Sequence, residues 1–566
     1  MKSIIDYSYN WMSLPKAINN NNKLKEKHDQ LSSRRKEVEK FLNGLSKDER
    51  KSWDDVVELD LDQLETRLRN KSLTPLQVLH AFQAKVLRLH DTLGNSGMCE
   101  FIREAEQEAT DLTNNPRLSS EQSPLYGIPI SLKELCAVKG YDCTIGLVKL
   151  IGQSKSEDSV VVRVLRKAGA VPFVLTATSQ LALTTTGFNP VYGDMHNPNS
   201  KDHEPGGGSP IGIGTDLLGS IRIPSAFCGI CGFKPTATRV STIGVVELDP
   251  RMVLPPFRVS VGPMGKRVSD LVRVMQVLFD TPMYEMDPTV IPLPFRHSIY
   301  DAVNGKPLVI GYYDTFDDPS LIQTVPSVRR GIAQAVEVMR KKGYHVIPFS
   351  PPRPAELLQL ILRAISPDGG QTASRLLSNE PLSEQTQAMR LMANTPDGLR
   401  GLLDGAARNN MGIPAAWAKM VQKLNRPQDL QEAMYQLQVY RREFLQAMEE
   451  AGSIDVILCP VWTSPAYAKG TPAYYTNPPM IYTGIYNAMD FPAGSVPIGR
   501  VTEEDVEESN KWAEERQKAK DRYHQRLFNM QSDTVGLPLA VQVAGKPYQD
   551  ELVLRMMREL ETGQNK

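Results

Sequence analysis

The stretch of sequence that decides the fold reads GGGSPIGIGTDLLGSIRIPS and covers residues 206–225. Six of its residues are glycine, which is used where the backbone turns sharply or approaches a ligand closely. A glycine-rich loop that ends at Ser220 predicts backbone N–H groups beside a serine nucleophile. A phosphate-binding loop is disfavoured because no Gly-Lys-Ser/Thr follows, and the glycine spacing does not match the dinucleotide-binding fingerprint. Composition alone also permits a plain surface loop of small residues.

On both sides of this stretch, short apolar runs alternate with amphipathic helical patterns. One helix is predicted to begin at Pro75, where Thr74 provides the cap, and others are predicted over residues 158–167 and 328–342. Six apolar runs are typical of buried strands and cover residues 127–132, 170–175, 308–313, 344–348, 455–461 and 537–543. The alternation predicts an α/β fold, with a central twisted mixed sheet covered by helices on both faces.

Two segments lack this alternation. Residues 19–40 carry mixed charges and predict a solvated linker and an exposed helix, within a polar, helical N-terminal segment over residues 1–60 that has no transmembrane span. Residues from about 378 to 427 show no strand pattern and predict a helical insertion. We therefore expect residues 61–566 to form one large domain that carries this insertion.

Composition narrows the partners and the compartment. The 566 residues include 65 basic and 65 acidic side chains, so a nucleic-acid partner is not implied. No apolar segment approaches the roughly 20 residues that a bilayer span needs. Six cysteines in so long a chain fit a reducing compartment. We expect a cytoplasmic protein, or one held peripherally at the surface of endomembranes.

The opening stretch resembles the signature of the amidase signature family, and within it the fatty acid amide hydrolase branch. The resemblance runs from about Thr74 to the C-terminus and includes YGIPISLKE at 126–134, DFPAG at 490–494 and VGLPLAVQ at 535–542. It implies the amidase signature fold over residues 61–566. It also implies hydrolysis of C–N bonds in linear amides, with fatty acid amides giving a free fatty acid and an amine or ammonia. The chain is similar as well to acetamidase-type enzymes, which act on small amides.

In this family a lysine, a bridging serine and a nucleophilic serine replace Ser-His-Asp, and the resemblance places the lysine at Lys133 and the nucleophile at Ser220. A lysine with a pKa of roughly 10.4 is a poor base at neutral pH, so burial in an apolar strand must favour its neutral form. Lys133 would take the proton from Ser220 and return it to the leaving nitrogen, which an amide requires. Taken alone, a lysine at a strand end more often pairs with an acid such as Glu134.

The turn before Ser220 departs from the family pattern at one position. The backbone N–H groups of Leu217, Leu218 and Gly219 would stabilise the tetrahedral oxyanion. Leu218 stands where the family has glycine. A positive φ there would cost roughly 1–2 kcal/mol, and the leucine side chain could crowd the carbonyl site.

The segment before this turn is shorter than in the family by about a dozen residues. Aligned from its N-terminal side, the bridging position is Gly208, with Ser209 beside it; aligned from its C-terminal side, Ser209 belongs to a later part of the signature. Neither alignment supplies a bridging serine directly, and Ser209 is the best substitute. Loss of a proton relay typically costs on the order of 10² to 10⁴ in rate, so the shortened segment is compatible with a slow enzyme rather than an inert one. The changes fit a catalytically weakened paralogue, and they fit equally the in-frame loss of an exon. A protein that binds acyl amides without turnover is the alternative from a different class.

Other motifs imply no cofactor and no metal. The eight histidines show no HExxH and no cysteine partners at zinc spacing. Cys228 and Cys231 have the spacing of a redox motif but no thioredoxin-like context, so we expect buried structural cysteines. The absence of a basic excess disfavours an amidotransferase that acts on charged tRNA. In fatty acid amide hydrolases a region similar to the insertion lies on membranes, so the resemblance implies contact with a membrane surface. It also implies a homodimer.

Overall fold

The computed structural model describes residues 14–115, 123–200, 202–203, 209–245, 257–302, 308–396, 399, 423–424, 426–471, 475 and 478–564. An eleven-stranded sheet runs through the molecule in the order β1-β3-β2-β6-β8-β7-β12-β13-β11-β9-β10. Its strands are β1 (Met98–Phe101), β2 (Pro129–Lys133), β3 (Val171–Thr176), β6 (Ile211–Asp216), β7 (Cys231–Lys234), β8 (Ser260–Gly265), β9 (Val309–Tyr312), β10 (His345–Pro348), β11 (Val456–Pro460), β12 (Ala493–Arg500) and β13 (Pro538–Gly545). A separate short ribbon pairs β4 (Phe188–Asn189) with β5 (Gly193–Asp194).

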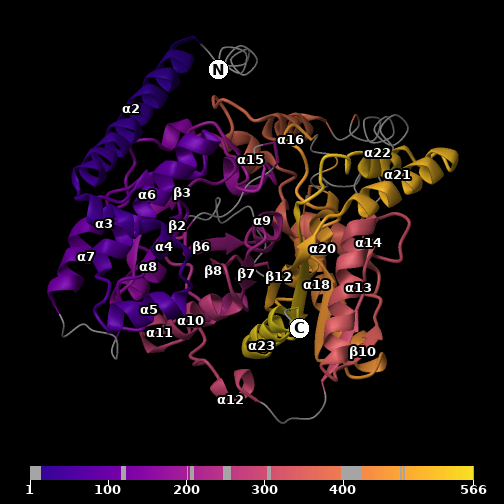
Figure 1. Ribbon diagram of the computed structural model, residues 1–566. Helices are drawn as coiled ribbons and strands as arrows, with labels where there is room; N and C mark the ends of the chain where they lie inside the picture. The colour runs from indigo at the N-terminus through magenta and orange to yellow at the C-terminus, as the bar shows by residue number, and fades with distance from the viewer. Residues whose placement is uncertain are drawn as a thin grey trace.

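The sheet is mixed, as the sequence predicts. Strands β3, β2 and β6 are parallel at one end, and β10, β9 and β11 are parallel at the other. Antiparallel pairs, among them β7 with β12, join these two groups in the middle. Figure 1 shows the N-terminal half of the chain on one side of the sheet's centre and the C-terminal half on the other.

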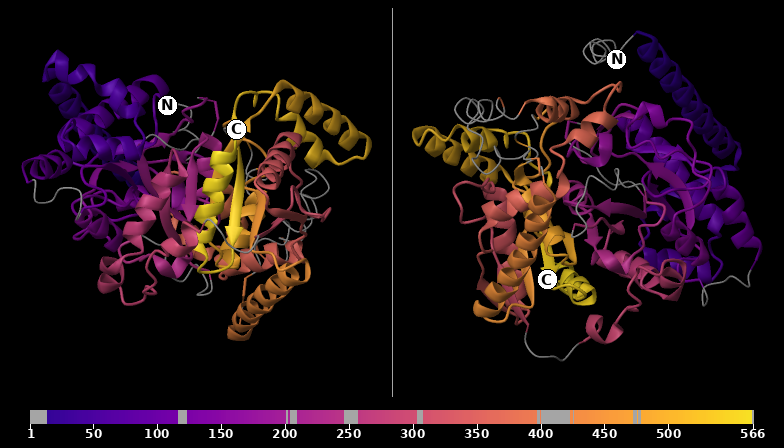
Figure 2. Two further views of the ribbon diagram at one scale, coloured as in Figure 1. Left: turned by 60° about the horizontal axis from the view of Figure 1, so that its bottom comes forward. Right: turned by 180° about the vertical axis from the view of Figure 1, so that it is seen from behind.

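Helices surround this sheet, as the further views in Figure 2 show. Those of the first half are α2 (Leu14–Gly44), α3 (Lys47–Lys51), α4 (Trp53–Glu58), α5 (Leu61–Arg69), α6 (Pro75–Leu93), α7 (Ala105–Asn114), α8 (Val160–Lys167), α9 (Arg222–Cys228), α10 (Val268–Leu278) and α11 (Thr281–Met286). Those that follow are α12 (His297–Tyr300), α13 (Pro326–Lys341), α14 (Pro354–Ile365), α15 (Gln371–Leu376), α16 (Glu384–Asn394), α18 (Pro427–Glu450), α20 (Ile481–Ala488), α21 (Glu503–Lys518), α22 (Arg522–Asn529) and α23 (Asp550–Gly563).

Both faces of the sheet are covered, and neighbouring strand residues show how. Gln542 of β13 bonds the side chain of Arg222 in α9 and the backbone of Tyr482 in α20. Successive residues of a strand point to opposite faces, so Val543 faces away from Gln542. Gly494 of β12 pairs with Val543 and therefore lies on the same face as Val543. A Cβ at Gly494 would contact the Met557 side chain of α23 on that face. Helices α9 and α20 therefore lie on one face and α23 on the other.

All six predicted strands and the three predicted helices are present. The prediction that the glycine-rich stretch is a loop is wrong for Ile211–Asp216, which forms β6, an interior strand of the sheet. Its glycines fit because neighbouring side chains occupy the space above them. A Cβ at Gly212 would lie 3.1 Å from Ser131 Oγ, and one at Gly214 would lie 3.2 Å from Ile221 Cγ1.

Residues 14–44 form helix α2, and the prediction that residues 19–40 are solvated is wrong for one face of this helix. Val38 and Leu42 join the main hydrophobic core. Lys27 is 2 % exposed and forms ion pairs with Glu100 at 2.8 Å and with Asp142 at 3.2 Å. Burial favours the neutral lysine, but the two carboxylates outweigh that effect and raise the pKa of Lys27.

The predicted insertion over residues 378–427 is described in part, and residues 378–383 and 423–424 of it are not helical. Helix α16 and the start of α18 belong to it, whereas residues 397–398, 400–422 and 425 lie outside the described part. Within the described ranges, no helix combines the length and the apolar character that crossing a membrane requires.

The buried contact of Lys27 yields a test of how firmly α2 is attached. We expect Lys27→Met to lower the free energy of unfolding by about 3 to 5 kcal/mol, because Glu100 and Asp142 would remain buried without their cation. Thermal and urea denaturation measure this change. The matched control is Lys25→Met, which removes an exposed lysine from the same helix. Equal stability of the two variants would contradict the role given to Lys27.

Candidate active site

A tight turn between β6 and α9 presents Ser220, and the carboxylate of Asp216 organises that turn. Asp216 ends β6 and is fully buried. Its Oδ1 accepts the Gly219 N–H at 2.7 Å and its Oδ2 accepts the Ile221 N–H at 3.2 Å. Burial alone would raise the pKa of Asp216, but the Arg222 guanidinium outweighs burial and holds that pKa well below its usual range.

Arg222 connects this turn to the rest of the molecule. Its guanidinium is fully buried and bonds both oxygens of Asp216, at 2.9 and 3.0 Å. The remaining N–H groups donate to three acceptors outside the turn, which are the Thr483 carbonyl, Gln542 Oε1 and Asn487 Oδ1. Helix α20 and strand β13 therefore hold the turn in place.

The backbone and the packing at position 219 admit only glycine. Its φ is +122°, and a Cβ there would lie 2.5 Å from Thr483 Oγ1 and 2.6 Å from Ile223 Cδ1. Leu218, in contrast, has no positive φ, so the backbone strain that a positive φ would cause at this leucine is absent. Its side chain packs beside Gly484 of α20 rather than lining the cavity at Ser220. The expected crowding by Leu218 is therefore not observed.

A cavity of about 200 Å³ brings the predicted catalytic residues together. Lys133 comes from the end of β2, Ser209 from just before β6, and Ser220 from the turn. Gly208 lies outside the described residues. Apolar side chains complete much of the wall, including Met98, Met195, Ile213, Ile223, Phe227 and Met264. The cavity thus combines a serine, a lysine and an apolar lining.

Lys133 does not pair with Glu134, the alternative that its position at a strand end suggested. Its Nζ donates a hydrogen bond to Thr215 Oγ1 at 3.1 Å, and the Glu134 carboxylate binds the N–H and hydroxyl of Thr144. Burial lowers the pKa of Lys133 below the usual lysine value. Desolvation therefore favours the neutral amine, which can accept a proton.

Ser209 lies beside Lys133 and Ser220 in the cavity but bonds other groups. Its hydroxyl is 2.5 Å from Ser131 Oγ and donates to the Ile211 carbonyl at 2.8 Å. In the described part of the chain, no hydrogen bond joins Ser209 to Lys133 or to Ser220. Sequence reasoning missed Ser131 and Thr215. The strand period could have indicated Ser131, because it lies two residues before Lys133 and on the same face.

Glu134 is a second buried ionisable group at the end of β2. It is fully buried, and this burial raises the pKa of its carboxyl to about 7. Cys228 and Cys231 are buried free thiols, which confirms their structural interpretation. Among the residues that the structure describes, no cluster of three His, Cys, Asp or Glu side chains could hold a metal ion.

Comparisons with known proteins identify the family. The pattern of the Amidase family matches residues 77–554. Fatty-acid amide hydrolase 1 of Sus scrofa is 34 % identical over 526 residues, which cover 89 % of this chain and 86 % of that protein. Acetamidase of Emericella nidulans is 27 % identical over 530 residues, which cover 89 % of this chain and 89 % of that protein. A solved structure of a fatty acid amide hydrolase has the same fold, with a TM-score of 0.74 at 24 % identity over 100 % of this chain and 97 % of that one.

Glu134 makes the stability of the fold depend on pH. Its pKa is about 7 when folded and near 4.5 when unfolded, so only the unfolded chain gains from ionisation as the pH rises between these values. Stability is therefore full below pH 4.5 and is lost as the pH rises through 7, by an amount on the order of 3 kcal/mol. We expect Glu134→Gln to lose less stability than the wild type between pH 5 and 8.

Urea denaturation at both pH values measures this difference. Glu157→Gln, at an exposed site, is the matched control and should follow the wild type. If Glu134→Gln also follows the wild type, the carboxyl of Glu134 ionises normally in the folded protein.

Proposed function

This chain belongs to the amidase family, and we propose that it hydrolyses the C–N bond of linear acyl amides with Ser220 as nucleophile and Lys133 as base. One observation carries the proposal: a lysine whose pKa is lowered by burial shares a small cavity with a serine on a constrained turn. Amide hydrolysis needs this combination because the base must also protonate the leaving nitrogen.

The proposed reaction has two stages. The neutral amine of Lys133 takes the hydroxyl proton as Ser220 Oγ bonds the carbonyl carbon. The resulting ammonium gives that proton to the amide nitrogen, the C–N bond breaks, and an acyl-serine remains. In the second stage Lys133 removes a proton from water, the hydroxide attacks the acyl-serine, and Ser220 recovers its proton as the carboxylic acid leaves.

We propose that backbone N–H groups of the turn bind the oxyanion formed in each stage. Of the three predicted donors, the Gly219 N–H already donates to Asp216. This leaves the N–H groups of Leu217 and Leu218 as the two predicted donors that an oxyanion would not have to share with Asp216. Their side chains pack into the core beside α20, which supports a fixed orientation of the turn.

The proposed substrate carries an apolar acyl group. Methionine and phenylalanine side chains line the cavity, and they favour a hydrocarbon chain over a small polar acyl group. One relative is named a fatty-acid amide hydrolase and another an acetamidase, so the names include both a long acyl group and a small one. We favour fatty acid amides, a choice that would place the protein in lipid metabolism, and keep small amides as the second candidate.

Peripheral membrane contact and a homodimer are part of the same proposal. Leu391 and Leu399, within the predicted insertion, expose 69 % and 53 % of their surface, and these apolar side chains are available to a lipid surface. Flotation with lipid vesicles tests the first point, and sedimentation of the purified chain tests the second. Absence of flotation would exclude the membrane contact, and a monomer at micromolar concentration would exclude the dimer.

The nucleophile and the base can be tested by active-site labelling. We expect a fluorophosphonate probe to label the wild type and not Ser220→Ala, because the probe reacts with an activated serine hydroxyl. Lys133→Ala should lower hydrolysis of oleamide by about 10² to 10⁴ and lower hydrolysis of the corresponding ester less, because an ester leaves without protonation.

The matched control for labelling is Ser225→Ala, in which the lost hydroxyl bonds the Ile221 carbonyl and does not line the cavity. A wild type that takes no label and hydrolyses neither oleamide nor acetamide would contradict the hydrolase proposal. It would favour instead a protein that binds acyl amides without turnover.

The hydroxyl that serves Lys133 can be identified by a second set of variants. We expect Thr215→Val to lower amide turnover by about 10²-fold, because it removes the group that holds the amine, and Thr215→Ser to retain activity. Ser209→Ala tests the predicted bridging serine in the same assay. Unchanged turnover in Ser209→Ala would exclude Ser209 as the bridge, and unchanged turnover in Thr215→Val would exclude Thr215 as the partner of Lys133.

A further inference from the structure

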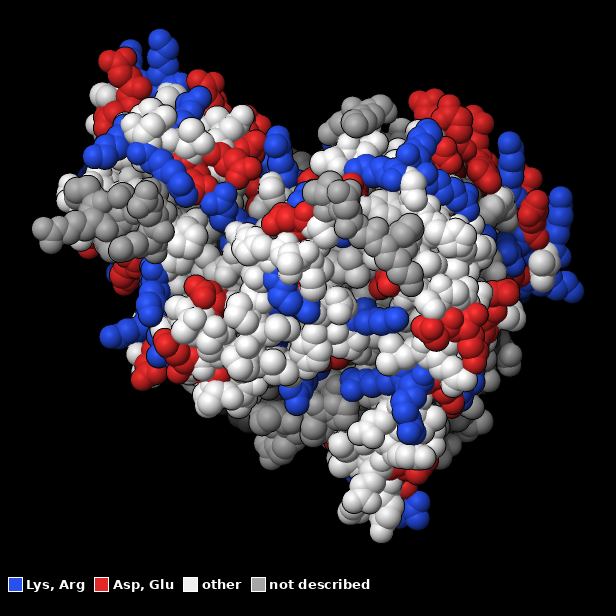
Figure 3. All heavy atoms as spheres, turned by 90° about the horizontal axis from the view of Figure 1, so that it is seen from below, with Lys and Arg blue, Asp and Glu red and all other residues white. Residues whose placement is uncertain are grey.

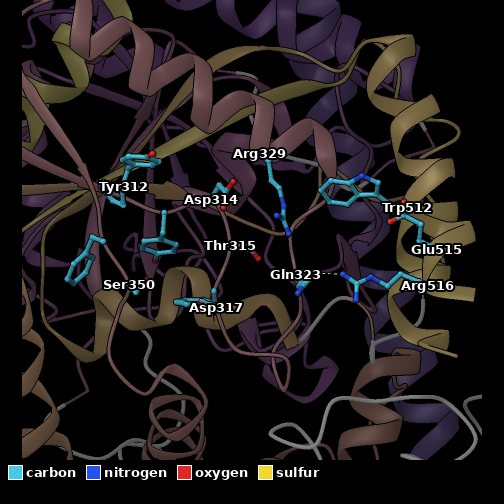
Figure 4. Close-up of a pocket in the computed structure, with 14 residues that line it drawn as sticks. Tyr312, Asp314, Thr315, Asp317, Gln323, Arg329, Ser350, Trp512, Glu515 and Arg516 are labelled. Carbon is cyan, nitrogen blue, oxygen red and sulfur yellow. Dashed lines mark hydrogen bonds between the residues drawn. The ribbon is translucent and has the colours of Figure 1, made fainter. Parts of the chain in front are cut away.

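A second cavity, of about 740 Å³, opens at the other end of the sheet and shares no lining residue with the first. It lies where the parallel strands β9 and β10 end, at Tyr312 and Pro348, and it is lined by the residues that follow these strands. In sheets of this kind, ligands bind beyond the carboxyl ends of parallel strands. Helix α21 closes the opposite side with Trp512, Glu515 and Arg516 (Figure 4).

Two arginines and one glutamate, Glu515, line the side of this cavity that α13 and α21 form. Arg329, in the first turn of α13, stacks its guanidinium on the Trp512 ring at 4.8 Å from the centroid. Its Nε donates weakly to the Thr324 carbonyl at 3.4 Å, and in the described part of the chain its other N–H groups donate to no protein atom. Arg516 reaches toward the same space and donates to Gln323 Oε1 at 2.7 Å (Figure 4). The N-terminus of α13 adds partial positive charge.

The loop after β9 contributes anionic groups to the same cavity. Asp314 and Asp317 both line it, and among the described residues their carboxylates have neither a hydrogen bond nor an ion pair. Neither carboxylate comes within ion-pair distance of Arg329. Figure 4 shows the two aspartates to one side of Arg329 and Arg516, with Thr315 between. Opposite charges therefore share the cavity without neutralising each other.

Among the described residues, Arg329, Asp314 and Asp317 have no ion pair, whereas Arg516 also pairs with Asp521 at 3.6 Å. A ligand that carries both charges would satisfy the groups of both signs that have no partner. A purely anionic ligand would be repelled by Asp314 and Asp317, and a purely cationic one by Arg329 and Arg516. A zwitterion can place its anionic group at the arginines, whose guanidinium forks suit carboxylate and phosphate oxygens, and its ammonium at the aspartates.

We propose that this cavity binds a small zwitterion, with its carboxylate or phosphate between Arg329 and Arg516 and its ammonium facing Asp314 and Asp317. The site is separate from the proposed hydrolase chemistry, and its test requires no turnover.

Isothermal titration calorimetry of the purified full chain tests the proposal with five probes. Glycine and phosphoethanolamine carry both charges, acetate and inorganic phosphate carry only the anion, and ethanolamine carries only the cation. We expect at least one zwitterion to bind about tenfold or more tightly than its single-charge counterparts. The better of glycine and phosphoethanolamine identifies the anionic group. Binding of acetate or phosphate as tightly as the matching zwitterion would overturn the proposal, and so would the absence of binding by all five probes.

Variants locate the binding in this cavity. We expect Arg329→Gln to weaken zwitterion binding about tenfold or more, because a charge-assisted hydrogen bond is lost. Asp317→Asn, at an exposed side chain, should remove the preference for the zwitterion over the anion. The matched control Lys341→Gln removes one positive charge from the same helix about 18 Å farther along and should bind as the wild type does.

Arg329 also packs on Trp512, so the folding of each variant is checked by its melting temperature without ligand. If Arg329→Gln fails to fold, Arg516→Gln and Asp317→Asn decide the question. Wild-type affinity in both of these variants would overturn the proposed site.

Discussion

The buried ion pair between Asp216 and Arg222 is the interaction on which the rest of the site depends. Both side chains are inaccessible to water, where an unpaired charge would be strongly destabilising. Because Asp216 ends β6 and Arg222 begins α9, their pairing closes the turn that presents Ser220. The same two residues engage Gly219, Thr483, Asn487 and Gln542, so the turn is attached to strands and helices far away in the sequence. The turn is therefore set before any substrate arrives.

Burial also sets the protonation of two neighbouring residues, Lys133 and Glu134. Lys133 ends β2 and Glu134 follows it directly, yet their side chains bond different groups, Thr215 and Thr144. Burial moves the pKa of each toward its neutral form, downward for the lysine and upward for the glutamate. Helix α20 contacts both the turn before Ser220 and the second cavity, because Thr483 bonds the Leu218 carbonyl and the Tyr482 hydroxyl lies 3.2 Å from Thr315 Oγ1. Charge on the surface, by contrast, is mixed: lysine and arginine alternate with acidic residues over the face in Figure 3.

Four of the six predicted strands share one property. The runs around Pro129, Val171, Val456 and Pro538 are mostly apolar, and such runs are typical of strands that are buried on both faces. Strand β6 escaped prediction because glycine has a low strand propensity. Its glycines are tolerated only because side chains such as Ser131 and Ile221, from other segments, lie against them. The residues within β6 do not indicate which side chains from other segments will pack against its glycines.

The sequence by itself determined the family and the fold class, and it proposed Lys133 and Ser220 for the candidate site, because both lie in short motifs that can be recognised from neighbouring residues alone. Tertiary structure decided which groups these residues meet. It brought Thr215, not Glu134, to Lys133, and it joined Ser209 to Ser131. It also buried Lys27 in a helix that reads as solvated. The physical reason is the same in each case: contacts between distant segments set burial and hydrogen bonding, and neither can be read from the spacing of residues along the chain.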